Sequence, residues 1–232
     1  MPNQNLFKTY FYIGADETSI FVKNNENSEI VYSKNQKIIK KFNYLNNNDI
    51  QSFFNDNIEE IEKKIKIFVE NIVLILEHKE IFSIRLSLKQ KVDNKNISNE
   101  EIQKLLSSGL QQIYKNHPKQ IILHYLIERV DIDGQLYESL ENKFIKNYLC
   151  IDLRFICIHQ NVINIFKDLF KKKQIFLGKV ISAKYINDFL TGKDNLISLI
   201  SKLEGGLNKL EVQLIPKKQE KKGFFERFFL SF

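Results

Sequence analysis

Side chains that commonly catalyse reactions or bind metals are few and widely separated in this chain. The four histidines fall at no spacing typical of a metal site or a catalytic triad: His78, His117, His124 and His159. His124 lies in an expected strand, where a hydrogen-bonded structural histidine is much commoner than a catalytic one. Asp131 and Asp133 flank a turn, which favours aspartate for its backbone bonding, and Asp152 has no paired carboxylate. We therefore expect no enzyme, no metal and no cofactor.

The glycines and cysteines also lack the spacing of a binding site. A phosphate-binding P-loop needs the pattern G-x-x-x-x-G-K-S/T after a strand. Thr191-Gly192-Lys193 and Gly205-Gly206 do not fit it, so we interpret both as turns. Cys150 and Cys157 lie seven residues apart in an expected strand and point to opposite faces, which fits neither a metal clip nor a disulfide. We expect both to be small buried hydrophobic side chains.

The last ten residues, 223–232, carry the strongest binding signal. On a helix, five phenylalanines share one face: Phe224, Phe225, Phe228, Phe229 and Phe232. Glu226, Arg227 and Ser231 take the other face, with Leu230 the one apolar exception. Lys217–Lys222 forms a charged spacer before this segment. We expect an amphipathic helix on a flexible tether, with the five phenylalanines, Lys221, Lys222 and Arg227 binding an anionic membrane surface.

Two alternatives remain for this aromatic segment: the groove of a partner protein and back-packing on the chain's own body. About three turns of helix are unstable alone, so the segment needs some surface. The lysine-rich spacer argues against back-packing, and the basic residues suit anionic headgroups. Burial of one phenylalanine contributes roughly 1.5–3 kcal/mol, against which the entropy of ordering counts. A single copy would bind weakly, so we expect self-association or capture by a membrane-bound partner.

Composition excludes several classes of protein. The chain has 232 residues and a net charge of +7, but lysine supplies nearly all the positive charge and arginine occurs only at positions 85, 129, 154 and 227. Nucleic-acid binding proteins rely on arginine clusters and exposed aromatics, so we do not expect nucleic acid as a partner. No apolar run approaches the roughly 20 residues of a spanning helix. The first residues lack a signal-peptide pattern, so we expect a cytoplasmic body.

The periodicity of apolar residues predicts an α+β protein. We expect strands at 7–13, 19–23, 29–33, 37–42, 81–88, 121–130, 149–158, 174–182 and 210–214. We expect helices from about Asn57 to Ile72, at 97–116, at 161–172 with Asn161 as its cap, and near 195–203. Residues 73–76 fit either a helix extension or a strand. Ser98 and Glu101 form a capping box, with Ile97 and Ile102 as a hydrophobic staple.

The order of these elements, with several short phrases, resembles the bacterial cell-division protein family FtsA. The phrases are Ile97-Ser-Asn-Glu-Glu-Ile and His117-Pro-Lys-Gln-Ile-Ile-Leu-His-Tyr-Leu-Ile-Glu-Arg-Val-Asp-Ile-Asp-Gly134. The resemblance implies a partial actin-like (ribonuclease H-like) lobe at 1–79 and an SHS2-type subdomain, also called 1C, at 80–190. A returning segment at 191–215 and a charged linker with a membrane-targeting helix at 216–232 would follow.

The departures from the family bear on nucleotide binding. The family's phosphate-handling aspartate is replaced by Tyr12 in the phrase Tyr12-Ile13-Gly14, and Leu203-Glu-Gly-Gly206 lacks the aspartate and threonine of the second phosphate motif. The second actin-like lobe has no counterpart in the sequence. The resemblance therefore implies an FtsA-like protein that does not bind ATP, and it leaves direct binding to the ring protein FtsZ in doubt.

Together these features predict a non-enzymatic adaptor of the septum, or divisome. It would lie on the inner face of the cell membrane, held by its C-terminal helix. The SHS2-like subdomain would bind other division proteins or FtsA-like subunits. The alternative is a soluble interaction module whose aromatic helix docks in a partner's groove.

Overall fold

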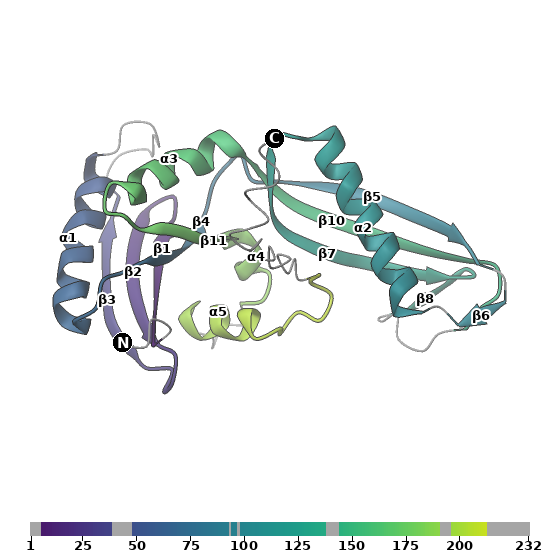
Figure 1. The fold of residues 1–232 in the computed structure, drawn as a ribbon, viewed down its shortest axis with the longest axis horizontal. Helices are drawn as coiled ribbons and strands as arrows, with labels where there is room; N and C mark the ends of the chain where they lie inside the picture. Colours follow the sequence, from purple (N-terminus) through teal and green to yellow (C-terminus); the bar gives the residue numbers. More distant parts are fainter. Residues whose placement is uncertain are drawn as a thin grey trace, which may run out of the picture.

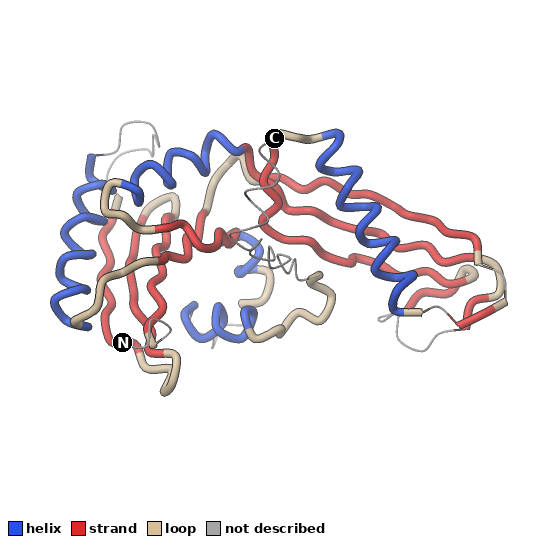
Figure 2. The backbone as a smooth tube through the Cα atoms, in the orientation of Figure 1, coloured by secondary structure: helices blue, strands red, loops and turns tan. Residues whose placement is uncertain are grey.

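Two larger sheets with helices packed on them make up the part of the chain that the computed structural model describes, residues 6–38, 48–92, 94–96, 98–137, 144–190 and 196–212. Figures 1 and 2 show them side by side. The elements are β1 (Phe7–Ile13), β2 (Glu17–Asn24), β3 (Ile30–Lys37), α1 (Asn48–Ile65), β4 (Asn71–Leu76), β5 (Phe82–Lys91), β6 (Lys95–Asn96), α2 (Asn99–Asn116), β7 (Gln120–Ile132), β8 (Gln135–Tyr137), β9 (Phe144–Ile145), β10 (Tyr148–His159), α3 (Gln160–Lys171), β11 (Phe176–Ser182), α4 (Ala183–Asn187) and α5 (Leu196–Glu204).

The first sheet has the strand order β11-β4-β1-β2-β3. β1, β4 and β11 are parallel, whereas β2 pairs antiparallel with both β1 and β3. The first three strands form the predicted antiparallel meander. β2, the second strand along the chain, is the one strand of this sheet that runs against the other four. This is the arrangement of an actin-like, ribonuclease H-like lobe. The prediction of an α+β fold is confirmed.

Helices cover both faces of the first sheet. Phe11 and Ile13 of β1 face α1 and α3, and Phe11 packs on Phe54 and Phe170 with ring centroids 5.3 and 6.1 Å away. Tyr10, on the opposite face, belongs to a second core with residues of α4 and α5. Successive residues of a strand point to opposite faces. This explains why β1 is apolar or aromatic at every position from Tyr10 to Ile13.

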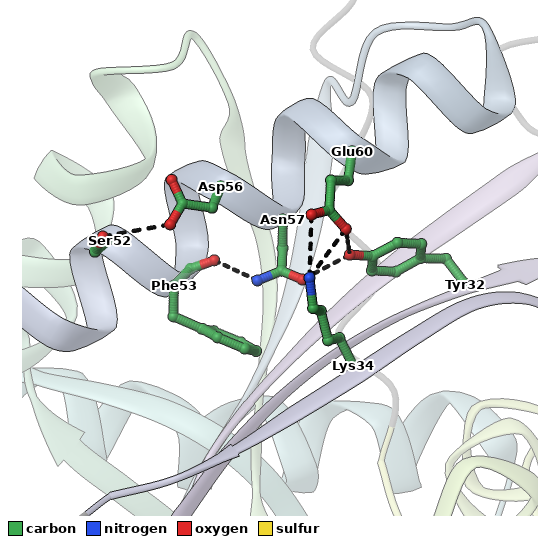
Figure 3. Close-up of polar contacts among 7 residues, drawn as sticks. All are labelled: Tyr32, Lys34, Ser52, Phe53, Asp56, Asn57 and Glu60. Carbon is green, nitrogen blue, oxygen red and sulfur yellow. Dashed lines mark hydrogen bonds and ion pairs between the residues drawn. The ribbon is translucent and has the colours of Figure 1, made fainter.

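A polar cluster fixes α1 to the edge strand β3 (Figure 3). The buried Asn57 amide donates from Nδ2 to the Phe53 carbonyl at 2.6 Å. The Tyr32 hydroxyl lies 2.6 Å from Asn57 Oδ1 and 2.7 Å from Glu60 Oε2, so its one proton serves either acceptor. Lys34 Nζ lies 3.1 Å from Glu60 Oε1. Both polar atoms of the buried amide are thus satisfied, as burial of an amide requires.

The second sheet has the order β5-β10-β7-β8, and all its pairings are antiparallel. α2 covers one face, where Leu106 and Ile113 join Leu149, Leu153 and Phe155 of β10 in a separate core. The expected strand at 81–88, helix at 97–116 and strands at 121–130 and 149–158 correspond to β5, α2, β7 and β10. Ser98 caps α2 through a capping box with Glu101, as predicted, whereas Ile97 lies outside the described residues.

The second sheet is inserted into the first between β4 and α3, which corrects one predicted boundary. Residues 80–190 were assigned to the second unit, but β11 pairs with β4 in the first sheet. Phe166 and Phe170 of α3 are buried in the core under that sheet. The second unit therefore ends at His159, because sequence periodicity gives the type of an element and not the sheet it joins.

The first predicted helix also differs at both ends. α1 begins at Asn48 rather than near Asn57, and it ends at Ile65, where Lys66 adopts a left-handed φ of 58°. The apolar stripe continues past this point by coincidence: Val69 lies in the following loop and Ile72 in β4. Residues 73–76 form the rest of β4, so the strand alternative was correct. The cap of α3 is His159, whose Nδ1 accepts from the Asn161 N–H at 3.2 Å, and not Asn161.

The remaining predictions are partly covered by the described residues. β3 ends at Lys37, and residues 39–42 of the strand expected there lie outside the description. Near Leu210–Leu214, Glu211 forms a bridge with Leu126 of β7, whereas residues 213 and 214 are not described. No helix within the described ranges is long and apolar enough to cross a membrane.

Candidate functional site

A large groove lies where the second sheet meets the first. Its walls come from α2, the first half of β7, α3, β11 and the segment 203–212, and it encloses about 1480 Å³. Leu106, Leu110 and Tyr114 of α2 and Ile121 and Leu123 of β7 give it apolar walls. Tyr114 is half exposed. A cavity of this size with apolar walls suits a segment of a protein partner better than a small metabolite.

Lysines surround the groove. Lys167 of α3, Lys179 of β11 and Lys209 are exposed and line it, together with the partly buried Lys8. Lys8 Nζ is paired with Glu204 Oε1 at 2.7 Å, and Glu204 also accepts from the Tyr10 hydroxyl at 2.8 Å. The second carboxylate of the groove, Glu211, is bound to His124 and Tyr185. The charge left at the rim is therefore positive.

His124 joins the two sheets at the base of this groove. Its Nε2 accepts from the Ser182 N–H at 3.0 Å, and its Nδ1 lies 2.9 Å from Glu211 Oε1. Because a backbone N–H can only donate, Nε2 carries no proton, and Nδ1–H donates to Glu211. The Tyr185 hydroxyl donates to Glu211 Oε2 at 2.7 Å, and its ring packs at a tilt against the imidazole, with the ring centroids 4.0 Å apart. The expectation of a satisfied structural histidine is confirmed.

The protonation states follow from burial and bonding. Burial lowers the pKa of His124, and this outweighs the neighbouring Glu211 carboxylate, which raises it. The imidazole is thus neutral at pH 7, as its bonding requires. Burial raises the pKa of Glu211, but hydrogen bonds from His124 and Tyr185 outweigh it, and the pKa lies below its usual value. The neutral His124 and the anionic Glu211 thus have their hydrogen-bond partners within the protein, and they link the two sheets rather than acting as a general acid–base pair.

The other candidate residues of the sequence have structural roles. His117 ends α2, His159 caps α3, and His78 accepts from the Glu80 N–H at 3.0 Å. Asp133 accepts from three backbone N–H groups, those of Lys146, Asn147 and Tyr148. Asp131 bonds to the Gly134 N–H at 2.9 Å, which confirms the predicted turn. Within the described ranges no three histidine, cysteine or acidic side chains could hold a metal ion.

The predicted glycine turns and cysteines can be placed in part. Gly206, with a φ of +87°, ends α5, so this pair of glycines is a helix cap. Thr191-Gly192-Lys193 lies outside the described residues. Both cysteines are free; Cys157 is buried, and burial raises the pKa of its thiol to about 11, whereas Cys150 is only partly buried.

Three of the four arginines converge on the open face of the second sheet, which sequence reasoning missed. Arg85 Nε lies 2.8 Å from Glu128 Oε2, Arg154 Nε lies 3.1 Å from Glu128 Oε1, and Arg129 Nε lies 2.6 Å from Asp152 Oδ2. Only the strand register could have revealed this, since it sets Arg154 opposite Arg85. Two carboxylates offset the three charges, so this face is not a strongly basic patch.

The predicted membrane-binding residues lie outside the described part of the structure. They are Phe224, Phe225, Phe228, Phe229, Phe232, Lys221, Lys222 and Arg227. Their role stays a prediction. The groove was not among the predicted sites, because its walls come from residues far apart in the sequence.

Comparisons with known proteins give no family. No protein-family model matches the chain, and no curated protein matches its sequence. Among solved structures, a PilM–PilN type IV pilus biogenesis complex is similar with a TM-score of 0.46 and 6% identity, over 77% of this chain and 48% of that one. The cytoplasmic domain of EpsL, an inner membrane component of the type II secretion system of Vibrio cholerae, gives 0.37 and 11%, over 81% and 60%.

A third similar structure is a Bacteroides thetaiotaomicron protein with an actin-like ATPase fold and unknown function, with a TM-score of 0.30 and 12% identity, over 80% of this chain and 56% of that one. The chain spans about half the length of these structures. At such scores and identities the likenesses carry no argument about activity or partners. The resemblance to FtsA stays a prediction.

Proposed function

We propose that this chain is a non-enzymatic adaptor of bacterial cell division. Residues 223–232 hold it on the inner face of the cell membrane, and its second sheet and groove bind other division proteins. The observation that carries the proposal is the groove, with apolar walls, a basic rim and about 1480 Å³ of space. The titratable groups at its base, His124 and Glu211, are committed to joining the two sheets.

The chemistry of the groove suggests the kind of segment it binds. Apolar walls favour leucine, isoleucine or aromatic side chains, and the exposed Lys167, Lys179 and Lys209 favour acidic residues beside them. An FtsA-like subunit or another division protein would supply such a segment.

The turn after β1 supports the proposal that the chain neither binds nor hydrolyses ATP. Tyr12 stands in place of the family's phosphate-handling aspartate, and its side chain lies over Gly14. A Cβ at Gly14 would meet the Tyr12 hydroxyl oxygen at 2.5 Å. The ring thus fills the space above this turn. A rise in melting temperature on adding magnesium and ATP would contradict this part of the proposal.

Vesicle flotation tests the membrane tether. The intact chain should float with vesicles containing phosphatidylglycerol, and a chain lacking residues 223–232 should bind them much more weakly. If the intact chain does not bind these vesicles but retains its protein partners, the alternative of a soluble module with a groove-docking helix is correct.

A fluorescent fusion of the chain tests the proposed role in cell division. The fusion should gather at the septum, and even labelling of the whole envelope would contradict a role in division.

Charge reversal tests the groove. The double variant K167E/K179E should lose the division proteins that co-purify with the intact chain. K115E is the matched control, since Lys115 is exposed on α2 but does not line the groove. Equal recovery of partners with both variants would show that binding occurs elsewhere.

A further inference from the structure

Two phenylalanines are the most exposed large apolar side chains in the described part of the chain. Phe68 is 81% exposed and Phe176 is 73% exposed. Phe68 lies in the loop between α1 and β4, and Phe176 is the first residue of the edge strand β11. Neither phenylalanine belongs to the groove. Single exposed apolar residues are common, but adjacent ones mark interaction sites.

The two segments that carry these rings are held side by side. β11 pairs in parallel with β4, and the register sets Phe176 opposite Asn71. The Phe176 N–H donates to the Glu70 carbonyl at 2.8 Å. Lys173, two residues after the end of α3, places its Nζ 2.8 Å from Oε1 of Glu59, in the second half of α1. Figure 1 shows β4 and β11 side by side in the first sheet.

Lysines dominate the charge around the two rings. Lys66 precedes Phe68, and Lys171 and Lys172 precede Phe176; all three are exposed. Lys64 Nζ lies instead over the Tyr32 ring of β3, at the opposite edge of the first sheet. The acidic residue nearest in sequence is Glu70, also exposed. Aromatic rings beside ammonium groups suit the boundary of an anionic bilayer, where the rings enter the headgroup region and the lysines meet phosphates.

We propose that this end of the first sheet is a second membrane contact, in which Phe68 and Phe176 enter the headgroup layer of an anionic bilayer. The inference rests on the proposed tethering of the chain by residues 223–232. Because the tether binds weakly alone, a second contact on the same chain would raise the overall affinity for the bilayer. It would also fix the orientation of the folded body on the membrane.

The absence of tryptophan from the chain allows a direct test. The full-length variants F68W and F176W each carry a single tryptophan, at the proposed contact, whose emission can be excited selectively. With vesicles of equal parts phosphatidylcholine and phosphatidylglycerol, their emission should shift to the blue and be quenched by brominated lipid. F144W is the matched control, because Phe144 is 53% exposed but lies in β9, outside the first sheet. Its emission should not change.

Affinity gives a second readout. F68S/F176S should weaken vesicle binding by about tenfold or more, whereas F144S should not. If the intact chain floats but the F68W and F176W spectra and the affinity of F68S/F176S are unchanged, the inference is wrong and the tether stands. If the intact chain does not float, the tether itself fails. A smaller sedimentation coefficient of F68S/F176S without vesicles would overturn the inference in favour of contact between copies.

Discussion

His124 is a buried residue whose partners lie far along the chain. Ser182 and Glu211 are 58 and 87 positions away, yet both bond to the same imidazole. Its low pKa has a consequence for stability. The unfolded chain takes up a proton near pH 6.5, while the folded imidazole resists protonation until the pH is lower. The contribution of His124 to the free energy of unfolding is therefore complete above about pH 6.5, and the free energy of unfolding falls as the pH drops below this value.

The first prediction is that H124Q reduces this loss of stability at acidic pH. For wild type, urea unfolding should give a lower free energy at pH 5.5 than at pH 7.5, by at most about 1.4 kcal/mol per pH unit for each such group. H124Q should show a smaller difference and a lower stability at both pH values. Burial also lowers the pKa of His78, so H78Q should remove a separate part of the difference. A difference that H124Q leaves unchanged would contradict the assignment.

The second prediction concerns the buried Asn57 amide. N57A leaves the Phe53 carbonyl and the Tyr32 hydroxyl each with one partner fewer and should cost about 1–3 kcal/mol. Y32F removes only a hydroxyl shared with Glu60 and should cost about 0.5–1.5 kcal/mol. S52A is the control, since Ser52 makes only a long 3.4 Å bond to Asp56. A double-mutant cycle in urea should give a coupling between Asn57 and Tyr32, and strict additivity would argue against the contact.

At the scale of elements, α2 shows how far local sequence can go. Its capping box was predicted from Ser98 and Glu101 alone, because both groups act within one turn of helix. The third prediction is that S98A lowers the free energy of unfolding by about 1 kcal/mol, through loss of the bond to the Glu101 N–H. S108A, an exposed serine within the same helix, should change little. Equal effects of the two changes would show that the cap contributes nothing.

Element types were predictable, whereas their pairing was not. β7 and β10 alternate clearly enough to be recognised, and the order strand, helix, strand, strand follows. The partnership of β11 with β4 spans about a hundred residues, and no local pattern encodes it. The end of α1 was predicted wrongly because Val69 and Ile72 continue the helical spacing. Both side chains are buried, but Val69 lies in a loop and Ile72 in β4. The groove could not be predicted from the sequence, because only the tertiary structure brings together the elements that form its walls.

At the scale of the molecule, the two sheets share a core. Leu126 of β7 and Ile156 of β10 belong to the second sheet but are buried with Tyr10, Tyr185 and Leu199 against the first. The fourth prediction is that L126A lowers the free energy of unfolding by about 2–5 kcal/mol and destabilises both sheets together. Hydrogen exchange should then speed up for slowly exchanging amides of β4 as well as β10. Faster exchange confined to the second sheet would show two independently stable units.

The passage from β10 to α3 has a mechanical consequence. His159 is at once the last residue of the strand and the cap of the helix, so no loop residue separates them. The twelve-residue strand extends roughly 40 Å, and the helix that continues it lies on the first sheet. With no hinge at the junction, a load applied at the far tip of the second sheet acts through a long lever arm. It reaches the first sheet as torque on α3.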